Sequence, residues 1–352
     1  MKIIIAAGGT GGHIYPALTL GEALKKRGHQ ILFVGSINRM EKDLIPSKGF
    51  EFEGLDVSIF NGNIIKRIKS LISIYKATSK CEELVKDYDM VIGFGNYISL
   101  PVILAAKKMG LKTIIHEQNS YAGKANLFLD KKVDLVIGSY KENKEQFRNK
   151  NTLIIGNPQS SKAVNVLKDS KVLKNMGLNP NIKTVVIFMG SLGSESINKV
   201  ILEYFKLVDG SYQIIYAAGK NYYQMVKNSN VENEFIKCFE YVDGVSLMKN
   251  STLLVCRAGA TTLSEITAIG MPAILIPSPY VPNNHQYYNA KSLVDKNAAL
   301  MIEEKDLSAK LLNDMITDTI NDDVKLRSIS NAAMTLGSPT VLEDMITLIE
   351  KL

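Results

Sequence analysis

A glycine-rich segment near the start of the chain, Gly8–Gly12, is followed directly by a histidine, His13. Glycines let the backbone turn tightly and bring its N–H groups close to a ligand. A helix expected over residues 17–26 would add the positive end of its dipole, so the segment favours binding of a phosphate group. His13 beside a helix N-terminus suits a general base, and the alternative is a histidine that only caps or packs the turn.

A dinucleotide cofactor would use a similar glycine segment, but the fit here is poor. Ile14 stands where the third glycine of that motif is required, and no acidic residue follows the second expected strand at Val34-Gly35-Ser36 to hold a ribose. The sequence therefore argues against a nicotinamide or flavin enzyme and predicts no cofactor.

A second glycine segment, Gly190–Gly193, follows an expected strand over residues 185–189 and precedes an expected helix over residues 197–208. Taken alone it is a weak signal, because many turns between a strand and a helix contain glycine. Its position nevertheless repeats the plan of the first half, in which a strand runs into a glycine turn and then a helix.

The segment from Cys256 to Glu265 carries a stronger pattern. Gly259 and Ala260 are small, and Thr261 is placed to cap the next helix, which would leave backbone N–H groups free for a diphosphate. Glu265 follows about one turn later, where a carboxylate can accept hydrogen bonds from both hydroxyls of a ribose. The alternative is an acidic side chain that only complements the helix dipole.

A proline-rich loop over residues 277–286 ends in Asn284, His285 and Gln286. These side chains offer hydrogen bonds suited to sugar hydroxyls, and a merely polar loop is the alternative.

The elements that must position these residues are short apolar strands alternating with helices. The strands are expected at residues 2–7, 31–34, 90–93, 113–116, 135–138 and 153–155, and then at 185–189, 213–217, 237–241, 253–255, 273–277 and 300–302. Runs that are apolar throughout are typical of strands buried on both faces of a parallel sheet. The fold class is therefore α/β, with two Rossmann-like, doubly wound parallel-sheet domains facing a cleft. We place them at residues 1–157 and 158–352, with the last helix a candidate to pack back on the first domain.

The excess positive charge of the chain lies in its first half. Residues 1–157 carry 23 Lys and Arg against 15 Asp and Glu, a net charge of +8, whereas residues 158–352 carry a net charge of −1. The first domain therefore suits an anionic partner.

A basic amphipathic stretch without any acidic residue runs from Val57 to Cys81. It combines an apolar helical face with basic residues on or beside the opposite face, namely Ile64, Ile65, Ile68, Leu71, Ile72 and Tyr75 with Lys66, Arg67 and Lys69. The pattern is typical of a helix lying on an anionic membrane surface, and the alternative is a helix packed on the sheet with a solvated basic face. Nucleic acid is disfavoured, because aromatic residues are not interleaved with the basic ones.

The cellular compartment is inferred from the lack of a membrane span or a signal peptide and from the few, widely spaced cysteines. No apolar run approaches the roughly 20 residues that span a bilayer, and the first residues read as a strand rather than a signal peptide. Three widely spaced cysteines, Cys81, Cys238 and Cys256, are expected to be buried thiols in a reducing compartment. We expect a cytoplasmic protein.

These segments together resemble the glycosyltransferases of family 28. The resemblance rests on Gly8–His13 with Pro16, Phe94-Gly95-Asn96-Tyr97, His116-Glu117-Gln118-Asn119, Gly156-Asn157-Pro158, Gly190–Gly193, the run from Arg257 to Glu265, and His285-Gln286. It implies the two-domain GT-B fold. It also implies an inverting transfer of N-acetylglucosamine from UDP-N-acetylglucosamine to the C4 hydroxyl of the muramoyl sugar of lipid I, undecaprenyl-pyrophosphoryl-MurNAc-pentapeptide, giving lipid II in peptidoglycan synthesis.

The resemblance also implies roles for individual residues. The donor would be held by Ser191, Val242, Ala260, Thr261, Glu265, His285 and Gln286. The acceptor and its diphosphate would lie at Thr10, Gly11, Gly12, Tyr97 and Asn119. The basic stretch would dock the enzyme on the cytoplasmic side of the cell membrane as a peripheral protein.

Two departures from the family pattern affect the donor site. Gln159 and Ser160 stand where the family often has an arginine that helps to hold the nucleotide, and Met189 replaces the first glycine of the second glycine motif. Neither change removes a group that the chemistry requires.

For the proton transfer we expect His13 to act as the base, with His116 and Glu117 as rivals. No paired carboxylate motif suggests Mg²⁺, so we expect no metal. Two other functions stay open: another UDP-sugar enzyme of the same fold, such as a UDP-sugar epimerase, and a non-enzymatic nucleotide-binding or membrane adaptor.

Overall fold

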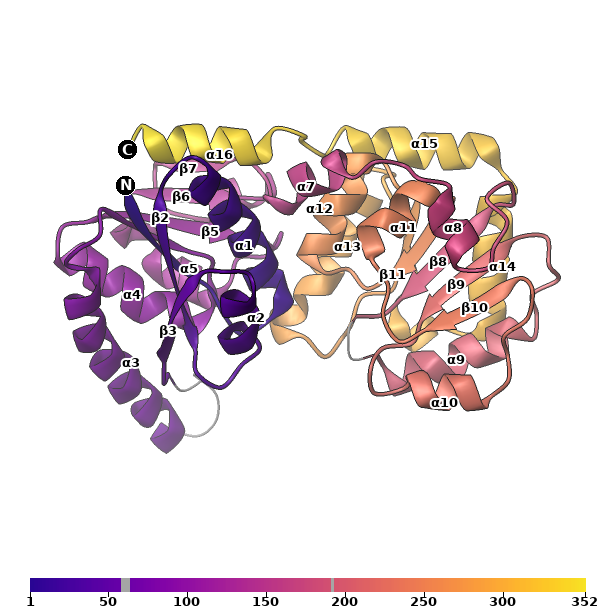
Figure 1. The fold of residues 1–352 in the computed structure, drawn as a ribbon, viewed down its shortest axis with the longest axis horizontal. Coiled ribbons are helices and arrows are strands. Elements are labelled where there is room, and N and C mark those ends of the chain that lie inside the picture. Colours follow the sequence, from indigo (N-terminus) through magenta and orange to yellow (C-terminus); the bar gives the residue numbers. More distant parts are fainter. Residues whose placement is uncertain (58–63, 191–192) are drawn as a thin grey trace. The chain divides into compact units, whose positions relative to one another are not determined.

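The computed structural model of the protein describes residues 1–57, 64–190 and 193–352, and the side chains within these ranges except those of residues 64–69 and 71. The chain forms two compact units (Figure 1). The first comprises residues 1–159 and 340–352, and the second comprises residues 160–339, compared with the division at residue 157 expected from the sequence.

The first unit is built on a seven-stranded parallel sheet in the order β3-β2-β1-β4-β5-β6-β7. Its strands are β1 (Lys2–Ala6), β2 (Gln30–Ser36), β3 (Glu51–Leu55), β4 (Met90–Gly93), β5 (Lys112–Glu117), β6 (Leu135–Gly138) and β7 (Thr152–Ile154). Two buried clusters cover the two faces of this sheet, because successive side chains of a strand point to opposite sides: Ile3 and Ile5 lie in one cluster, and Ile4 and Ala6 in the other.

Helices fill both faces of the first sheet. The helices are α1 (Gly11–Lys26), α2 (Glu41–Ser47), α3 (Ile64–Val85), α4 (Asn96–Lys108), α5 (Lys124–Leu129), α6 (Asn143–Gln146) and α16 (Val341–Glu350), with the short 3₁₀ helix η1 (Asp130–Lys132). Residues of α1 and α16 share one buried cluster, and residues of α3 and α4 share the other. The C-terminal helix α16 runs beside α1 in Figure 1 and places Val341, Met345 and Ile349 in the core of the first unit.

The second unit is built on a six-stranded parallel sheet in the order β10-β9-β8-β11-β12-β13. Its strands are β8 (Thr184–Phe188), β9 (Gln213–Ala217), β10 (Ile236–Phe239), β11 (Leu253–Cys256), β12 (Ala273–Leu275) and β13 (Leu300–Met301). Its helices are α7 (Gln159–Asn165), α8 (Lys171–Asn175), α9 (Glu195–Phe205), α10 (Tyr223–Asn228), α11 (Gly244–Asn250), α12 (Ala260–Ile269), α13 (His285–Val294), α14 (Ala309–Ile320) and α15 (Asp323–Met334), with 3₁₀ helices η2 (Pro282–Asn284) and η3 (Glu304–Asp306).

The α/β class with two parallel sheets is confirmed, and each expected strand is present with bounds that differ by at most two residues. One strand, β3, was not expected. Its sequence, Glu51 to Leu55, alternates charged and apolar residues, and it lies at the edge of the sheet beside β2. An edge strand needs no unbroken apolar run, so the pattern that found the other strands misses it.

The first helix also begins earlier than expected. Helix α1 starts at Gly11, with Thr10 in an extended conformation before it, so Gly11, Gly12 and His13 form its first turn. The helix was expected to begin at residue 17, but the structure includes Pro16 and the five residues before it in the helix. The glycine segment is therefore partly a helix N-terminus.

The structure also tests the expectations about membrane-spanning helices and about the cysteines. In the described ranges, no helix is both long and apolar enough to cross a membrane. Cys81, Cys238 and Cys256 are buried free thiols, as the sequence suggested.

Candidate active site

His13 lies in the first turn of α1 and reaches across to the end of the neighbouring strand β4. Its Nδ1 lies 2.8 Å from the carbonyl oxygen of Phe94 and 3.2 Å from Oε1 of Gln118. Because a carbonyl oxygen can only accept, Nδ1 carries the hydrogen in this contact. In the neutral imidazole, Nε2 then keeps its lone pair, which is the form that a general base requires.

A buried glutamate that the sequence did not single out holds the first glycine segment in place. Oε1 of Glu41 accepts from the N–H of Gly9 at 3.1 Å and from the N–H of Ser36 at 3.0 Å. The side chain is fully buried, and no partner for Oε2 exists among the described residues. Glycine is required around it, because a Cβ at Gly8 would lie 2.4 Å from Oε1.

Asn96 supports the same segment from the start of α4. It adopts a positive φ of 64°, donates from Nδ2 to the carbonyl of Gly8 at 2.9 Å, and accepts from the N–H of Tyr97 at 2.6 Å. Gly9 cannot carry a side chain, since a Cβ there would lie 2.1 Å from Nδ2 of Asn96. The N–H of Gly9 is therefore already hydrogen-bonded to Glu41. The N–H groups of Gly11 and Gly12 lie in the first turn of α1, where N–H groups have no partner within the helix.

His116 lies close to this segment but has a different environment. It is fully buried on β5, and its Nε2 donates to the carbonyl of Gly156 at 2.9 Å. Nδ1 is buried and has no hydrogen-bond partner among the described residues. Burial lowers the pKa of His116 to about 4, partly offset by the bond to Gly156, so the ring is neutral at physiological pH.

Glu117 is also buried, and both of its oxygens are engaged. Oε1 accepts from the backbone N–H and the side-chain amide of Asn119, and Oε2 accepts from the N–H of Gly123 and from Nδ2 of Asn126. The carboxylate thus organises the loop after β5, including Asn119. The first unit brings Thr10, Gly11, Gly12, His13, Tyr97, His116, Glu117 and Asn119 to the carboxyl ends of β1, β4 and β5.

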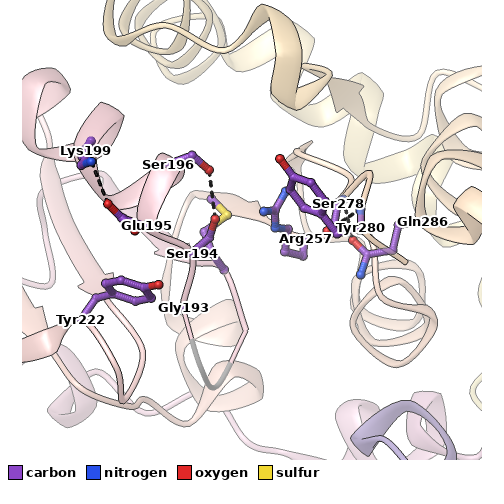
Figure 2. A pocket seen from close by; sticks show the side chains of 11 residues that line it. Gly193, Ser194, Glu195, Ser196, Lys199, Tyr222, Arg257, Ser278, Tyr280 and Gln286 are labelled. Carbon is purple, nitrogen blue, oxygen red and sulfur yellow. Dashed lines mark hydrogen bonds and ion pairs between the residues drawn. The ribbon is translucent and has the colours of Figure 1, made fainter. Parts of the chain in front are cut away.

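A cavity of about 700 Å³ opens in the second unit at the carboxyl ends of its strands (Figure 2). It is lined by Met189, Gly193, Ser194, Glu195, Ser196, Lys199, Tyr222, Arg257, Ser278, Tyr280 and Gln286. Its walls come from the turn after β8 with the start of α9, from the segment between β9 and α10, from the turn after β11, and from the loop after β12 with the start of α13. The sequence motifs at Gly193, Arg257 and Gln286 therefore meet in one cavity.

The loop after β12 is tied to the start of α13. Oε1 of Gln286 accepts from the N–H of Ser278 at 2.9 Å, and the two residues lie together at one wall of the cavity (Figure 2). Nδ1 of His285 donates to the carbonyl of Pro282 at 2.8 Å. His285 begins α13 but is not among the cavity-lining residues, whereas Gln286 is.

The turn after β11 ends in an uncapped helix. Gly259 is the N-cap residue of α12, no side chain caps the helix, and a Cβ at Gly259 would meet nothing within 4 Å. Thr261 was expected to cap this helix. That expectation is wrong, because the helix begins at Ala260 and Thr261 lies inside its first turn. The first-turn N–H groups of α12 have no partner within the helix and no side-chain cap, which suits an anion.

Glu265 lies one turn into α12 in a poorly hydrated position. Burial raises its pKa to about 8, Lys162 lowers it and Asp243 raises it further. A carboxyl group with this pKa is largely protonated at neutral pH, so it can both donate and accept a hydrogen bond. Val242 is 8% exposed in the loop between β10 and α11 of the same unit.

Some expected residues cannot be placed. Ser191 lies outside the described residues, as do the side chains of seven residues of the basic stretch, Ile64, Ile65, Lys66, Arg67, Ile68, Lys69 and Leu71. The stretch does form a helix, α3, and the two described members of its apolar face, Ile72 and Tyr75, are 50% and 78% exposed.

Gln159 and Met189 stand at the two positions where the sequence departs from the family pattern, and their surroundings differ. Gln159 is buried and accepts from the hydroxyl of Thr19 at 2.5 Å, and Met189 lines the cavity. Lys162, on α7, is the cation that acts on Glu265.

The sequence did not single out Glu41, Lys162 or Glu304, because each lies outside the motifs that predicted the other site residues.

Both halves of the chain match models of one enzyme family. Residues 3–137 match the glycosyltransferase family 28 N-terminal domain, and residues 184–344 match the glycosyltransferase family 28 C-terminal domain. A relative from Halalkalibacterium halodurans is 35% identical over 100% of this chain and 99% of its own length. Its name is "UDP-N-acetylglucosamine--N-acetylmuramyl-(pentapeptide) pyrophosphoryl-undecaprenol N-acetylglucosamine transferase".

Solved structures with the same fold include a crystal structure of MurG from Acinetobacter baumannii. It has a TM-score of 0.79 and 24% identity, and the match covers 100% of this chain and 99% of that one. A putative UDP-N-acetylglucosamine 2-epimerase from Listeria monocytogenes has a TM-score of 0.71 and 14% identity, with coverage of 99% and 95%.

The protein is thus a glycosyltransferase with the GT-B fold. The chain belongs to glycosyltransferase family 28.

The raised pKa of Glu265 leads to a prediction about stability and pH. Because the folded protein binds this proton more tightly than the unfolded chain does, stability should fall as the pH rises from about 4.5, the ordinary value, to about 8. In Glu265→Gln this loss is absent, so the melting temperature of the variant should exceed that of the wild type at pH 8.5 and approach it at pH 4.5.

Thermal unfolding at both pH values tests this, with the exposed Glu234→Gln as the matched control that leaves the pH dependence unchanged. Parallel pH profiles for Glu265→Gln and the wild type would show that burial does not penalise this carboxylate.

Proposed function

We propose that the protein transfers N-acetylglucosamine from UDP-N-acetylglucosamine to the C4 hydroxyl of the muramoyl sugar of lipid I, with inversion at the sugar carbon, and so forms lipid II. The observation that carries this proposal is the second-unit cavity, with Arg257 at its wall and the uncapped N-terminus of α12 in the same unit. It occurs in a chain with full-length relatives of that name.

The donor is assigned to the second unit. The diphosphate would bind at the N-terminus of α12, around Ala260 and Thr261, with help from Arg257 and from the glycine turn that contains Ser191. Glu265 would hold the ribose, and Val242 would lie by the uracil. Gln286, with His285 beside it, would bind hydroxyls of the N-acetylglucosamine ring.

The acceptor is assigned to the first unit. The diphosphate of lipid I would bind at Thr10, Gly11 and Gly12, where the N-terminus of α1 presents its N–H groups. Tyr97 lies in the first turn of α4, directly after β4, and Asn119 lies on the loop after β5. Both would contact the acceptor.

His13 is the base that the geometry favours over its two rivals. Its Nδ1 is fixed by Phe94, which leaves Nε2 to take the proton from the C4 hydroxyl. His116 is fully buried and bonded to Gly156, and both oxygens of Glu117 are engaged. These two residues would position the loop and the backbone around His13 rather than transfer the proton. The departing UDP would be stabilised by the helix terminus and by Arg257.

Membrane association is assigned to α3. Exposed Ile72 and Tyr75 would enter the interface of an anionic membrane, and the basic residues of the stretch would meet the lipid headgroups. The enzyme would then work as a peripheral protein on the cytoplasmic side of the cell membrane, where its lipid-linked acceptor is anchored.

The second candidate function is that of a UDP-sugar epimerase. It is motivated by the structural similarity to a putative UDP-N-acetylglucosamine 2-epimerase. The test is an assay with UDP-N-acetylglucosamine in the presence and absence of a lipid I analogue. We expect release of UDP and a disaccharide product only when the acceptor is present. Consumption or isomerisation of the donor without acceptor would favour the epimerase instead.

Replacement of His13 should slow the chemical step. His13→Asn keeps a side-chain donor for the Phe94 carbonyl but removes the base, so kcat should fall by a factor of about 10² to 10⁴ with little change in KM for the donor. Steady-state kinetics with the lipid I analogue measures this, with His29→Asn as the matched control. Near-wild-type kcat for His13→Asn, with loss of turnover in His116→Asn, would show that the base is not His13.

Replacement of the exposed apolar residues of α3 should weaken membrane binding. Ile72→Asp with Tyr75→Asp should reduce association with phosphatidylglycerol vesicles by roughly tenfold, because it removes two interfacial anchors and adds two negative charges. Vesicle sedimentation measures the effect. Leu207→Asp, at an exposed apolar residue of the second unit, is the control that should bind like the wild type. Equal sedimentation of all three proteins would contradict the assignment.

A further inference from the structure

An acidic residue outside every motif, Glu304, lies behind the wall of the second-unit cavity. It begins the short helix η3, and its side chain is 9% exposed. Oε2 of Glu304 lies 2.7 Å from Nη1 of Arg257, whose own side chain is 12% exposed. A cation that lines the cavity is therefore paired with a buried carboxylate before any ligand arrives.

The contacts of Arg257 leave half of its guanidinium for a ligand. In the described part of the chain its polar contacts all use Nη1, which also donates to the carbonyl of Ile276 at 3.1 Å. Nη2 and Nε remain as donors, and the guanidinium points toward the turn with Ser194 and Ser196 (Figure 2). The planar group is thus held through Nη1, and Arg257 is one of the residues that line the cavity.

Glu304 also contacts the other wall of the cavity. Its Oε1 accepts from the hydroxyl of Ser196 at 2.8 Å, and the hydroxyls of Ser194 and Ser196 lie 3.2 Å apart. Ser196 is in the first turn of α9, directly after the glycine turn that follows β8, while Arg257 follows β11. One carboxylate therefore joins the two turns that flank the cavity.

The ion pair is close but not aligned as a hydrogen bond. No N–H of the described chain points at Oε2 of Glu304 well enough to form one, although Nη1 lies at 2.7 Å. A charge pair held mainly by Coulomb attraction leaves the guanidinium able to share its charge with a second anion. Nucleotide phosphates and Glu304 would then compete for the same cation.

We propose that Glu304 is a positioning residue of the donor site, which orients the Arg257 guanidinium and moderates its hold on the nucleotide diphosphate. This inference rests on the proposed function, because it takes the cavity to be the UDP-sugar site. Glu304 holds the cation at one edge, and its negative charge weakens the attraction between Arg257 and UDP. The product can therefore leave after transfer.

The direct test is the affinity for UDP. Glu304→Gln keeps the shape of the side chain and an oxygen for Ser196, but it removes the charge that competes with the phosphates for Arg257. The Kd for UDP, measured by isothermal titration calorimetry on the full chain, should fall roughly fivefold, and inhibition by UDP in turnover should strengthen in parallel. Asp306→Asn removes one charge from the same short helix at an exposed position and should leave the Kd unchanged.

A double-mutant cycle separates positioning through Arg257 from a general structural effect. In an Arg257→Gln background, Glu304→Gln should no longer tighten UDP binding, because the cation through which it acts is gone. An unchanged Kd in Glu304→Gln, or the same change in both backgrounds, would overturn the inference. A wild-type protein that does not bind UDP at all would instead overturn the proposed function, and this inference with it.

Discussion

Every strand of both sheets runs parallel to its neighbours, and this constraint decides where chemistry can occur. In a parallel sheet all carboxyl ends lie at one edge, and each is followed by a turn into a helix. The N–H groups of the first helical turn have no partner within the helix. The constraint therefore gathers helix N-termini, and with them positive potential, at one edge of each unit. In this chain α1 presents such a terminus in the first unit and α12 in the second.

Acidic side chains shape both edges, and they do so in different ways. In the first unit, Glu41 occupies the N–H of Gly9 and thereby fixes the conformation of the glycine segment. In the second unit, Glu304 is paired with Arg257, and Glu265 has a pKa of about 8 because burial disfavours its charge. Each of these carboxyl groups is thus hydrogen-bonded, paired with a cation or largely neutral. Under the proposed function, such arrangements would reduce the repulsion of a diphosphate.

The sequence alone was enough to predict the strand–turn–helix units that repeat along the chain and the strands that are apolar throughout. The buried strands could be predicted because unbroken apolar runs occur only where both faces of a sheet are covered. The turns at Gly8 and Gly259 could be predicted because glycine permits close approach of backbone and ligand. The edge strand β3 could not, since two glutamates and a glycine interrupt its apolar residues. The start of α1 at Gly11 was also missed, because glycines and Pro16 disfavour a helix locally and tertiary packing overrides them. Glu41 and Glu304 act through contacts 32 or 47 positions along the chain, with Gly9 and Arg257, and local patterns carry no trace of them.

The central claim is that the nucleotide binds in the second unit and not at the first glycine segment, although both offer helix N-termini. Hydrogen exchange of the full chain with and without UDP tests this most directly, because backbone N–H groups that bind phosphate become protected. The account predicts slower exchange in residues 193–196 and 257–265, and unchanged exchange in residues 8–13 and 94–97. Protection confined to residues 8–13 would contradict it and would place the donor in the first unit.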